Sequence, residues 1–185
     1  SVDSKTVLGA FDGSQLEHDG VTWTFRTDGD AFLVDSDESG EIISHQVAKV
    51  FGVTPLQQYL VEFSGGRMQA LPTAWDSRTK EEGGQRWYHI YPSEHIPPGD
   101  ELHWQGINQT WNSMCAECHS TDLVRGWDAD QQEFHTTWKE DDVSCEACHG
   151  PGSLHVEWAE GKISSEPPAG LFLLDGLGDK DNGKW

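Results

Sequence analysis

The sequence predicts an α+β protein, with a β-rich N-terminal part followed by a region of loops and short helices. In the first half, apolar residues alternate with polar ones or form short runs bounded by Gly, Asp and Pro, which is typical of strands. In the second half this alternation is lost and short polar and Pro-Gly segments interrupt the chain. We expect a β-rich subdomain at 1–92, a functional region at 93–163 and an extended tail at 164–185.

The expected strands follow from local patterns. Val21, Trp23 and Phe25 alternate with polar residues, and the run 31–34 follows an Asp-Gly-Asp turn, which predicts a tight pair of strands. The apolar run 56–63 leads through two glycines into 67–75, which predicts a hairpin. A last strand at 86–91 ends at a proline.

The second region is expected to contain few regular elements. A short helix is predicted from Leu154 to Glu160, after a Gly-Pro-Gly segment. Several tryptophans in this region offer broad apolar surfaces against which a planar cofactor or an ordinary core could pack; they are Trp104, Trp111, Trp127, Trp138 and Trp158.

Composition excludes two classes of function. The 185 residues include 12 Lys+Arg and 32 Asp+Glu, a formal charge of −20, so no basic surface for nucleic acid is expected. No apolar stretch reaches the 18 or more residues of a membrane span. Only 35% of residues are hydrophobic, which suggests that something besides side chains fills part of the interior.

All four cysteines occur in two short motifs. Cys115 and Cys118 are followed by His119, and Cys145 and Cys148 are followed by His149. This C-x-x-C-H pattern is the attachment signal for c-type haem, since two thiols three positions apart can bond the two vinyl groups of one porphyrin edge. The adjoining imidazole then binds iron. The sequence therefore predicts two covalent haem c groups, with Cys115, Cys118, Cys145 and Cys148 holding the rings and His119 and His149 as iron ligands.

A structural zinc module is the alternative from another class. Four thiolates in two C-x-x-C pairs are the ligands of a zinc ribbon, and they can also hold an iron–sulfur cluster. The gap between the pairs is longer than the usual ribbon spacing, and a four-cysteine site gives no reason for a histidine after each pair. Haem is therefore the favoured interpretation.

Two haems need up to two further axial ligands. Six residues separate His149 from His155, and an extended stretch of that length spans only about 20 Å, so His155 can hardly pass round its own porphyrin. If His155 is a ligand, it serves a neighbouring haem. His103 and His89 are the other main candidates: His103 lies twelve residues before Cys115 and could reach the first haem, and His89, on an expected strand, could reach either iron. Weaker candidates are His95, His135, His18, His45, Met68 and Met114.

The chain resembles a known family over roughly residues 40 to 160. It is similar to bacterial multihaem cytochromes c, in particular the tetrahaem cytochromes related to hydroxylamine oxidation, whose members often carry tetratricopeptide repeats. The block from Cys145 to His155 is its most specific part. The resemblance implies stacked haems in which the histidine at the position of His155 ligates a haem held by a different motif. The segments that carry the resemblance are 51–60, 67–75, 84–89, 100–104, 111–121 and 142–155.

The sequence also departs from that family. Relatives usually carry a C-x-x-C-H upstream of the region that begins at Val7 and another beyond the position of Trp185, and this sequence has neither. Either this is a two-haem protein or it is a middle portion of a longer chain. We expect a middle portion, with further haem-bearing segments or chains as neighbours.

The expected function is one-electron transfer by a periplasmic or cell-surface protein, because haem thioethers form outside the cytoplasm and c-type haem suits electron transfer. The acidic surface favours basic redox partners, although it can also serve solubility alone. An enzyme is the alternative: beside a five-coordinate first haem, His103 or His89 would donate a proton, and the substrate would be a small nitrogen compound.

Overall fold

The structure is a computed structural model that describes residues 2–37, 40–149 and 152–162. The chain forms two compact units, which are described separately. The first unit comprises the chain up to Cys115 together with Arg125–Thr136, and the second comprises Ala116–Val124 and the chain from Thr137 onward. The predicted tail at 164–185 lies outside the described residues, and the predicted boundary at residue 92 stays a prediction.

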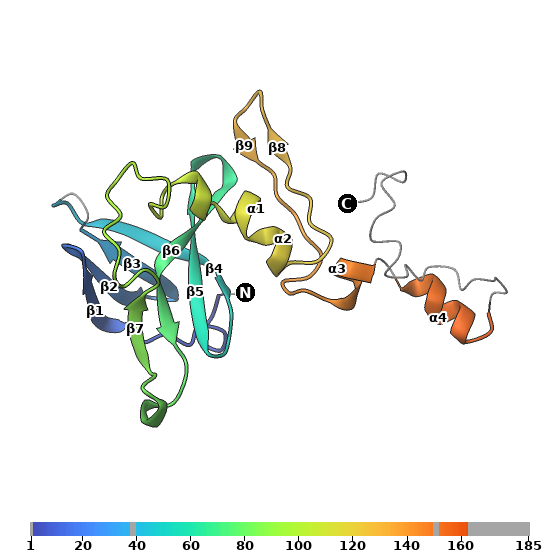
Figure 1. Cartoon of the computed structure of the whole chain (residues 1–185), viewed down its shortest axis with the longest axis horizontal. Coiled ribbons are helices and arrows are strands. Elements are labelled where there is room, and N and C mark those ends of the chain that lie inside the picture. The colour runs from blue at the N-terminus through green and yellow to red at the C-terminus, as the bar shows by residue number, and fades with distance from the viewer. Residues whose placement is uncertain (1, 38–39, 150–151, 163–185) are drawn as a thin grey trace. The chain divides into compact units, whose positions relative to one another are not determined.

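A seven-stranded antiparallel sheet forms the first unit, with its strands in the order of the chain (Figure 1). The two edge strands lie against each other, so the sheet curls into a nearly closed barrel. Such closure protects strand edges that would otherwise pair with other chains. The strands are β1 (Asp12–His18), β2 (Val21–Asp28), β3 (Ala31–Ser36), β4 (Ile43–Phe51), β5 (Leu56–Phe63), β6 (Arg67–Asp76) and β7 (Arg86–His89).

The α+β class predicted from the sequence is wrong, because the described residues are mainly β and form a nearly closed antiparallel sheet rather than a helical cytochrome domain. The described helices have only four to seven residues: α1 (Trp111–Met114), α2 (Ala116–His119), α3 (Cys145–His149) and α4 (Ser153–Ala159). Helices this short are not stable by themselves and depend on tertiary contacts. A further small hairpin joins β8 (Trp127–Asp128) to β9 (Glu133–Phe134). The sequence prediction therefore gave these short helices too much weight when it assigned the fold class.

The individual strands were predicted more accurately than the fold class. The pair around 21–26 and 31–34 is β2 and β3, and the hairpin turned on the glycines is β5 and β6, joined by a 3₁₀ turn at Ser64–Gly66. The sequence analysis missed β1 and β4. Both carry many polar residues and are half exposed along much of their length, so their apolar alternation is weak.

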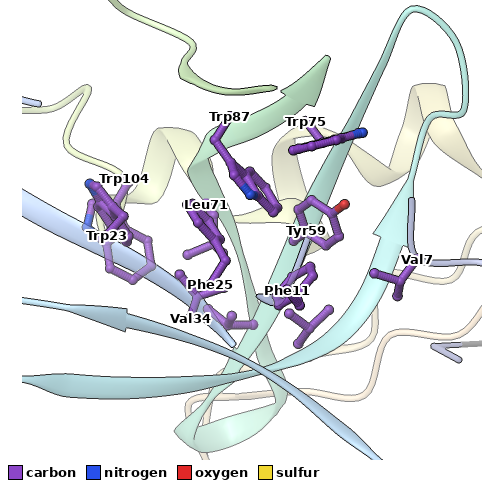
Figure 2. Packing of buried hydrophobic residues seen from close by; sticks show 12 residues of the cluster. Val7, Phe11, Trp23, Phe25, Val34, Tyr59, Leu71, Trp75, Trp87 and Trp104 are labelled. Carbon is purple, nitrogen blue, oxygen red and sulfur yellow. The ribbon is translucent and has the colours of Figure 1, made fainter. Parts of the chain in front are cut away.

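Aromatic side chains fill the inside of the curled sheet (Figure 2). Phe25 is fully buried and stacks on Trp87, with ring centroids 3.5 Å apart. Phe11 contacts Phe25, Tyr59 and Trp87 in edge-to-face pairs. Large rings bury much apolar area per residue, which compensates for the low hydrophobic content of the chain.

The segment before β1 is held to the sheet by a buried polar network. The Gln57 side-chain oxygen accepts hydrogen bonds from the Leu8 amide at 2.8 Å and from the Tyr59 hydroxyl at 2.8 Å. The Gly9 amide donates to the Tyr59 hydroxyl at 3.0 Å. A Cβ at Gly9 would lie 2.5 Å from that hydroxyl oxygen, so only glycine fits there. These bonds satisfy groups that would be costly to bury alone.

Strand β6 fixes the segment that leads to the first motif. The Gln69 side-chain amide donates to the carbonyl oxygens of Trp104 and Gly106, at 2.5 and 2.7 Å, and the Thr110 hydroxyl donates to Gln69 at 3.2 Å. Asn112, on α1, accepts from the Met68 amide at 2.7 Å and donates to the Gly66 carbonyl at 3.2 Å. The backbone just before Cys115 is therefore anchored on the barrel.

Replacing Asn112 by Ala is expected to lower the free energy of unfolding by about 1–3 kcal/mol, because the partly buried Met68 amide would lose its acceptor on the buried Asn112 side chain. Urea unfolding followed by far-ultraviolet circular dichroism measures this. Asn108→Ala is the matched control, since its amide makes an exposed bond to Glu101 and its loss should cost less than about 1 kcal/mol. Equal losses for the two variants would contradict the anchoring role.

Candidate functional site

The first C-x-x-C-H motif follows α1 directly. Cys115 is half-buried and forms the C-cap of α1, with its amide donating to the Trp111 carbonyl at 3.1 Å. Cys118 and His119 end the short helix α2 and are exposed. Cys115 belongs to the first unit, and Cys118 and His119 belong to the second.

The second motif forms helix α3 and lies wholly in the second unit. Cys145 and Cys148 are both exposed. Residues three apart on a helix share one face, so both thiols are presented on the same side of α3. His149 is the last residue of the helix. An exposed pair of thiols on one helix face is the arrangement that can bond both vinyl groups of a porphyrin edge, so these residues fit haem c.

A buried threonine joins the two motifs within the second unit. Thr121, two residues after His119, donates its hydroxyl to the Asp142 carbonyl at 2.8 Å and accepts from the Ser144 amide at 2.9 Å. Its main chain also pairs with Lys139 and Glu140. Ser144 directly precedes Cys145, so the Cα atoms of His119 and Cys145 lie within roughly 18 Å of each other. The end of one motif and the start of the other are thus held together.

Helix α4 begins shortly after the second motif. The Gly152 amide donates to the Glu146 carboxylate, on α3, at 3.0 Å. Helix α4 runs from Ser153 to Ala159, close to the predicted 154–160, and carries the predicted ligand His155. The side chains of His149 and His155 lie outside what the structure describes, so their role as iron ligands stays a prediction.

Large apolar side chains are exposed near both motifs in the sequence. Met114 precedes Cys115 and is 52% exposed, and Val143 lies two residues before Cys145 and is 50% exposed. Val124 and Trp127, which follow the first motif, are also more than half exposed. Single exposed apolar side chains are common on protein surfaces, so these residues do not by themselves mark a binding site.

The structure brings the predicted ligands His89 and His103 to one cavity, in the first unit. His89 ends β7 and is half-buried, and His103 lies in the loop before α1 and is buried. In each ring, Nδ1 accepts a hydrogen bond from the backbone amide two residues later. The donor is Tyr91 for His89, at 3.2 Å, and Gln105 for His103, at 3.4 Å. A neutral imidazole bonded in this way carries its proton on Nε2. An iron bond through Nε2 would require that proton to leave.

Three further residues line this cavity: His18 and His95, which the sequence analysis named as weaker ligand candidates, and Asp19, which it did not single out. His18, at the end of β1, stacks on His89 with ring centroids 3.7 Å apart and an interplanar angle of 3°. His95 Nδ1 contacts the Asp19 carboxylate at 2.5 Å. No local sequence signal links these residues, because they come from opposite ends of the barrel sheet and from the loop after β7.

The four histidines that line this cavity, His18, His89, His95 and His103, do not form a metal site in this structure. Across residues 2–37, 40–149 and 152–162, no three or more His, Cys, Asp or Glu residues are arranged to hold a metal ion. The zinc alternative therefore has no preformed cluster in this part of the chain.

The two motifs described above are of the kind that attaches c-type haem covalently. Residues 79–150 match the family model described as cytochrome c554 and c-prime. This match supports a cytochrome c-type protein, implies haem c with its iron, and is consistent with a haem-based role in electron transfer. The matched segment contains both motifs, His89 and His103.

No curated protein and no solved structure matches the chain. Among the described residues, no helix is long and apolar enough to cross a membrane.

Replacing Thr121 by Val is expected to destabilise the second unit by about 1–3 kcal/mol, because the Ser144 amide loses its acceptor while the side chain keeps its shape. Hydrogen exchange should then be roughly ten-fold or more faster at the amides of Thr121 and Val124. Thr137→Val is the control, since Thr137 is exposed and bonds Val124 through its main chain. Unchanged exchange in the Thr121 variant would show that its hydroxyl does not join the motifs.

Folding stability should depend on pH through His89. Burial, together with the neighbouring His18, lowers the pKa of His89 to about 4, against about 6.5 for a solvated imidazole. The unfolded chain therefore binds more protons between these pH values, and stability falls as the pH drops from about 6.5 to about 4. Because His89 is only half-buried, we expect a loss of about 1–2 kcal/mol.

Urea unfolding of the parent and of His89→Gln at pH 7, 5.5 and 4 measures this component. The parent should lose about 1–2 kcal/mol more than the variant over this range. His135→Gln, which changes an exposed histidine, should keep the parental dependence. Parallel curves for parent and His89→Gln would contradict the assignment.

Proposed function

We propose that the chain is an electron-transfer protein that carries two covalently bound c-type haems, one on each C-x-x-C-H motif. The observation that carries this proposal is the pairing of the two motifs through Thr121 in the second unit. Haems attached to segments that lie so close together can exchange electrons readily. Exposed thiols at Cys118, Cys145 and Cys148 leave the attachment positions open to the cofactor.

Each attached ring takes one axial ligand from its own motif, His119 for the first and His149 for the second. His155 is proposed as a ligand for a neighbouring haem. The Glu146 bond to Gly152 supports this, since it fixes where α4 starts relative to α3. His103 and His89 are proposed as distal ligands only in a state in which Nε2 is free of its proton.

The proposed partners are redox proteins with basic surfaces and further haem-bearing segments or chains. Carboxylates surround the second motif in the sequence: Glu140, Asp141, Asp142 and Glu146 are all exposed. The one lysine nearby, Lys139, pairs with Asp122. Electrostatic attraction to a basic partner would speed association at low salt. The proposed location is the periplasm or the cell surface, since c-type cytochromes are typically extracytoplasmic.

Expression in a bacterial host that attaches haem c tests the haem count. The intact mass and the pyridine haemochrome spectrum should show two haems in the parent and one in Cys145→Ala/Cys148→Ala. The same loss of one haem is expected for Cys115→Ala/Cys118→Ala, because each motif holds its own ring. Ala147→Ser changes a residue between the second pair of thiols and should retain both haems.

A colourless parent, or a parent with bound zinc in place of haem, would overturn the proposal. Spectra that do not change on addition of cyanide or carbon monoxide are expected, since a carrier has no open iron position. A shifted spectrum would favour the catalytic alternative.

A further inference from the structure

The loop between β7 and α1 contains an open groove. The groove belongs to the first unit and has a volume of about 370 Å³. Its lining residues all come from one stretch of the chain, 98–107. Pockets that bury small ligands have volumes of about 300–1,000 Å³, so the groove has room for one long side chain.

Hydrogen bonds fix the shape of this loop. The Asn108 side-chain amide donates to the Glu101 carbonyl at 3.0 Å, and the Gly106 amide donates to the His103 carbonyl at 2.7 Å. The side-chain amide of Gln69, on β6, donates to the Gly106 carbonyl at 2.7 Å. A surface that is already ordered loses less conformational entropy when a partner binds. The groove is therefore preformed on the barrel.

The surroundings of the groove are acidic. Asp100 and Glu101 line it and are exposed. Residues 87–124 contain five carboxylate side chains and no Lys or Arg. Arg67 donates to the Gln105 carbonyl at 2.9 Å but does not line the groove. A positively charged group that enters the groove therefore meets two carboxylates and no Lys or Arg among the lining residues.

Apolar groups lie beside these carboxylates. Ile107 is 73% exposed and lines the groove together with Pro98. Leu102, in the same loop, is 49% exposed. The side chains of Arg and Lys combine an apolar stem with a charged head. The stem can pack on Ile107 and Pro98 while the head pairs with the carboxylates, so the groove is complementary to one long basic side chain.

The groove is close to the first attachment motif along the chain. Ile107–Gln109 forms a 3₁₀ turn and α1 follows it, so the Cα atoms of Ile107 and Cys115 lie within roughly 18 Å of each other. Both residues belong to the first unit. A partner seated on the groove would therefore be near a haem carried by that motif.

We propose that this groove is a docking site for a basic redox protein, which inserts one Arg or Lys side chain between Ile107 and the carboxylates of Asp100 and Glu101. The proposal rests on the proposed electron-transfer function and names the surface that its partner uses. Charge attraction governs the rate of association, and the packing on Ile107 governs the lifetime of the complex.

Surface plasmon resonance of the haem-loaded protein with mitochondrial cytochrome c, a basic one-electron carrier, tests the docking site. Both proteins are kept oxidised, so that binding is measured without electron transfer. Asp100→Asn/Glu101→Gln should weaken binding about five-fold or more at low salt, mainly through slower association. Asn at position 100 keeps the oxygen that accepts from the Leu102 amide at 2.8 Å, so the loop retains its shape.

Glu41→Gln/Glu62→Gln is the matched control. It removes the same charge from exposed positions of the first unit that do not line the groove, and it should weaken binding less than about two-fold. Equal effects of the two double variants, or no binding by the parent, would overturn the proposal.

Ile107→Ala tests the apolar wall. It should make dissociation about three-fold faster and leave the association rate unchanged, because packing is lost and charge is kept. Val53→Ala removes a similarly exposed apolar side chain, 67% exposed and outside the groove, and should keep the parental rates. Parental dissociation of Ile107→Ala would show that no side chain enters the groove.

The docking site and the proposed function fail in different ways. A colourless parent, or a haem-loaded parent that transfers no electron to mitochondrial cytochrome c in stopped-flow mixing, overturns both. A haem-loaded parent that transfers electrons, and whose Asp100→Asn/Glu101→Gln variant binds as tightly as the control, overturns the docking site alone.

Discussion

The central constraint on this molecule is that each pair of thiols must be open to a cofactor while the backbone that carries it stays fixed. Cys145 and Cys148 meet both conditions on α3, a helix too short to be stable without support. The support comes from Thr121, whose buried hydroxyl bonds the residue directly before Cys145. In the first unit, Asn112 holds the segment before Cys115 to the sheet, because its side-chain oxygen accepts a hydrogen bond from the Met68 amide.

The curled sheet supplies the rigid base for that second anchor. Its aromatic interior gives stability to a chain with few aliphatic residues, and β6 uses Gln69 and the main chain around Met68 to hold the loop before α1. Through these contacts the sheet fixes the backbone that leads to Cys115 in the first unit.

Features that depend on residues close together in the sequence were predicted, and features that depend on residues far apart in the sequence were not. The glycine-turned hairpin and the strands β2 and β3 were predicted, because turn residues and apolar alternation act over a few positions. β1 and β4 were missed, since they are recognisable mainly through the neighbours they pair with. The stack of His18 on His89 had no local signal at all.

The sequence alone determined which thiols and imidazoles lie together in each C-x-x-C-H motif, because residues within five consecutive positions are placed by covalent geometry and one helical turn. The tertiary structure decided which distant groups meet: Thr121 with Ser144, His18 with His89, and His95 with Asp19. Those contacts arise from strand pairing and chain reversal, whose outcome depends on the packing of the whole unit rather than on any short stretch of residues.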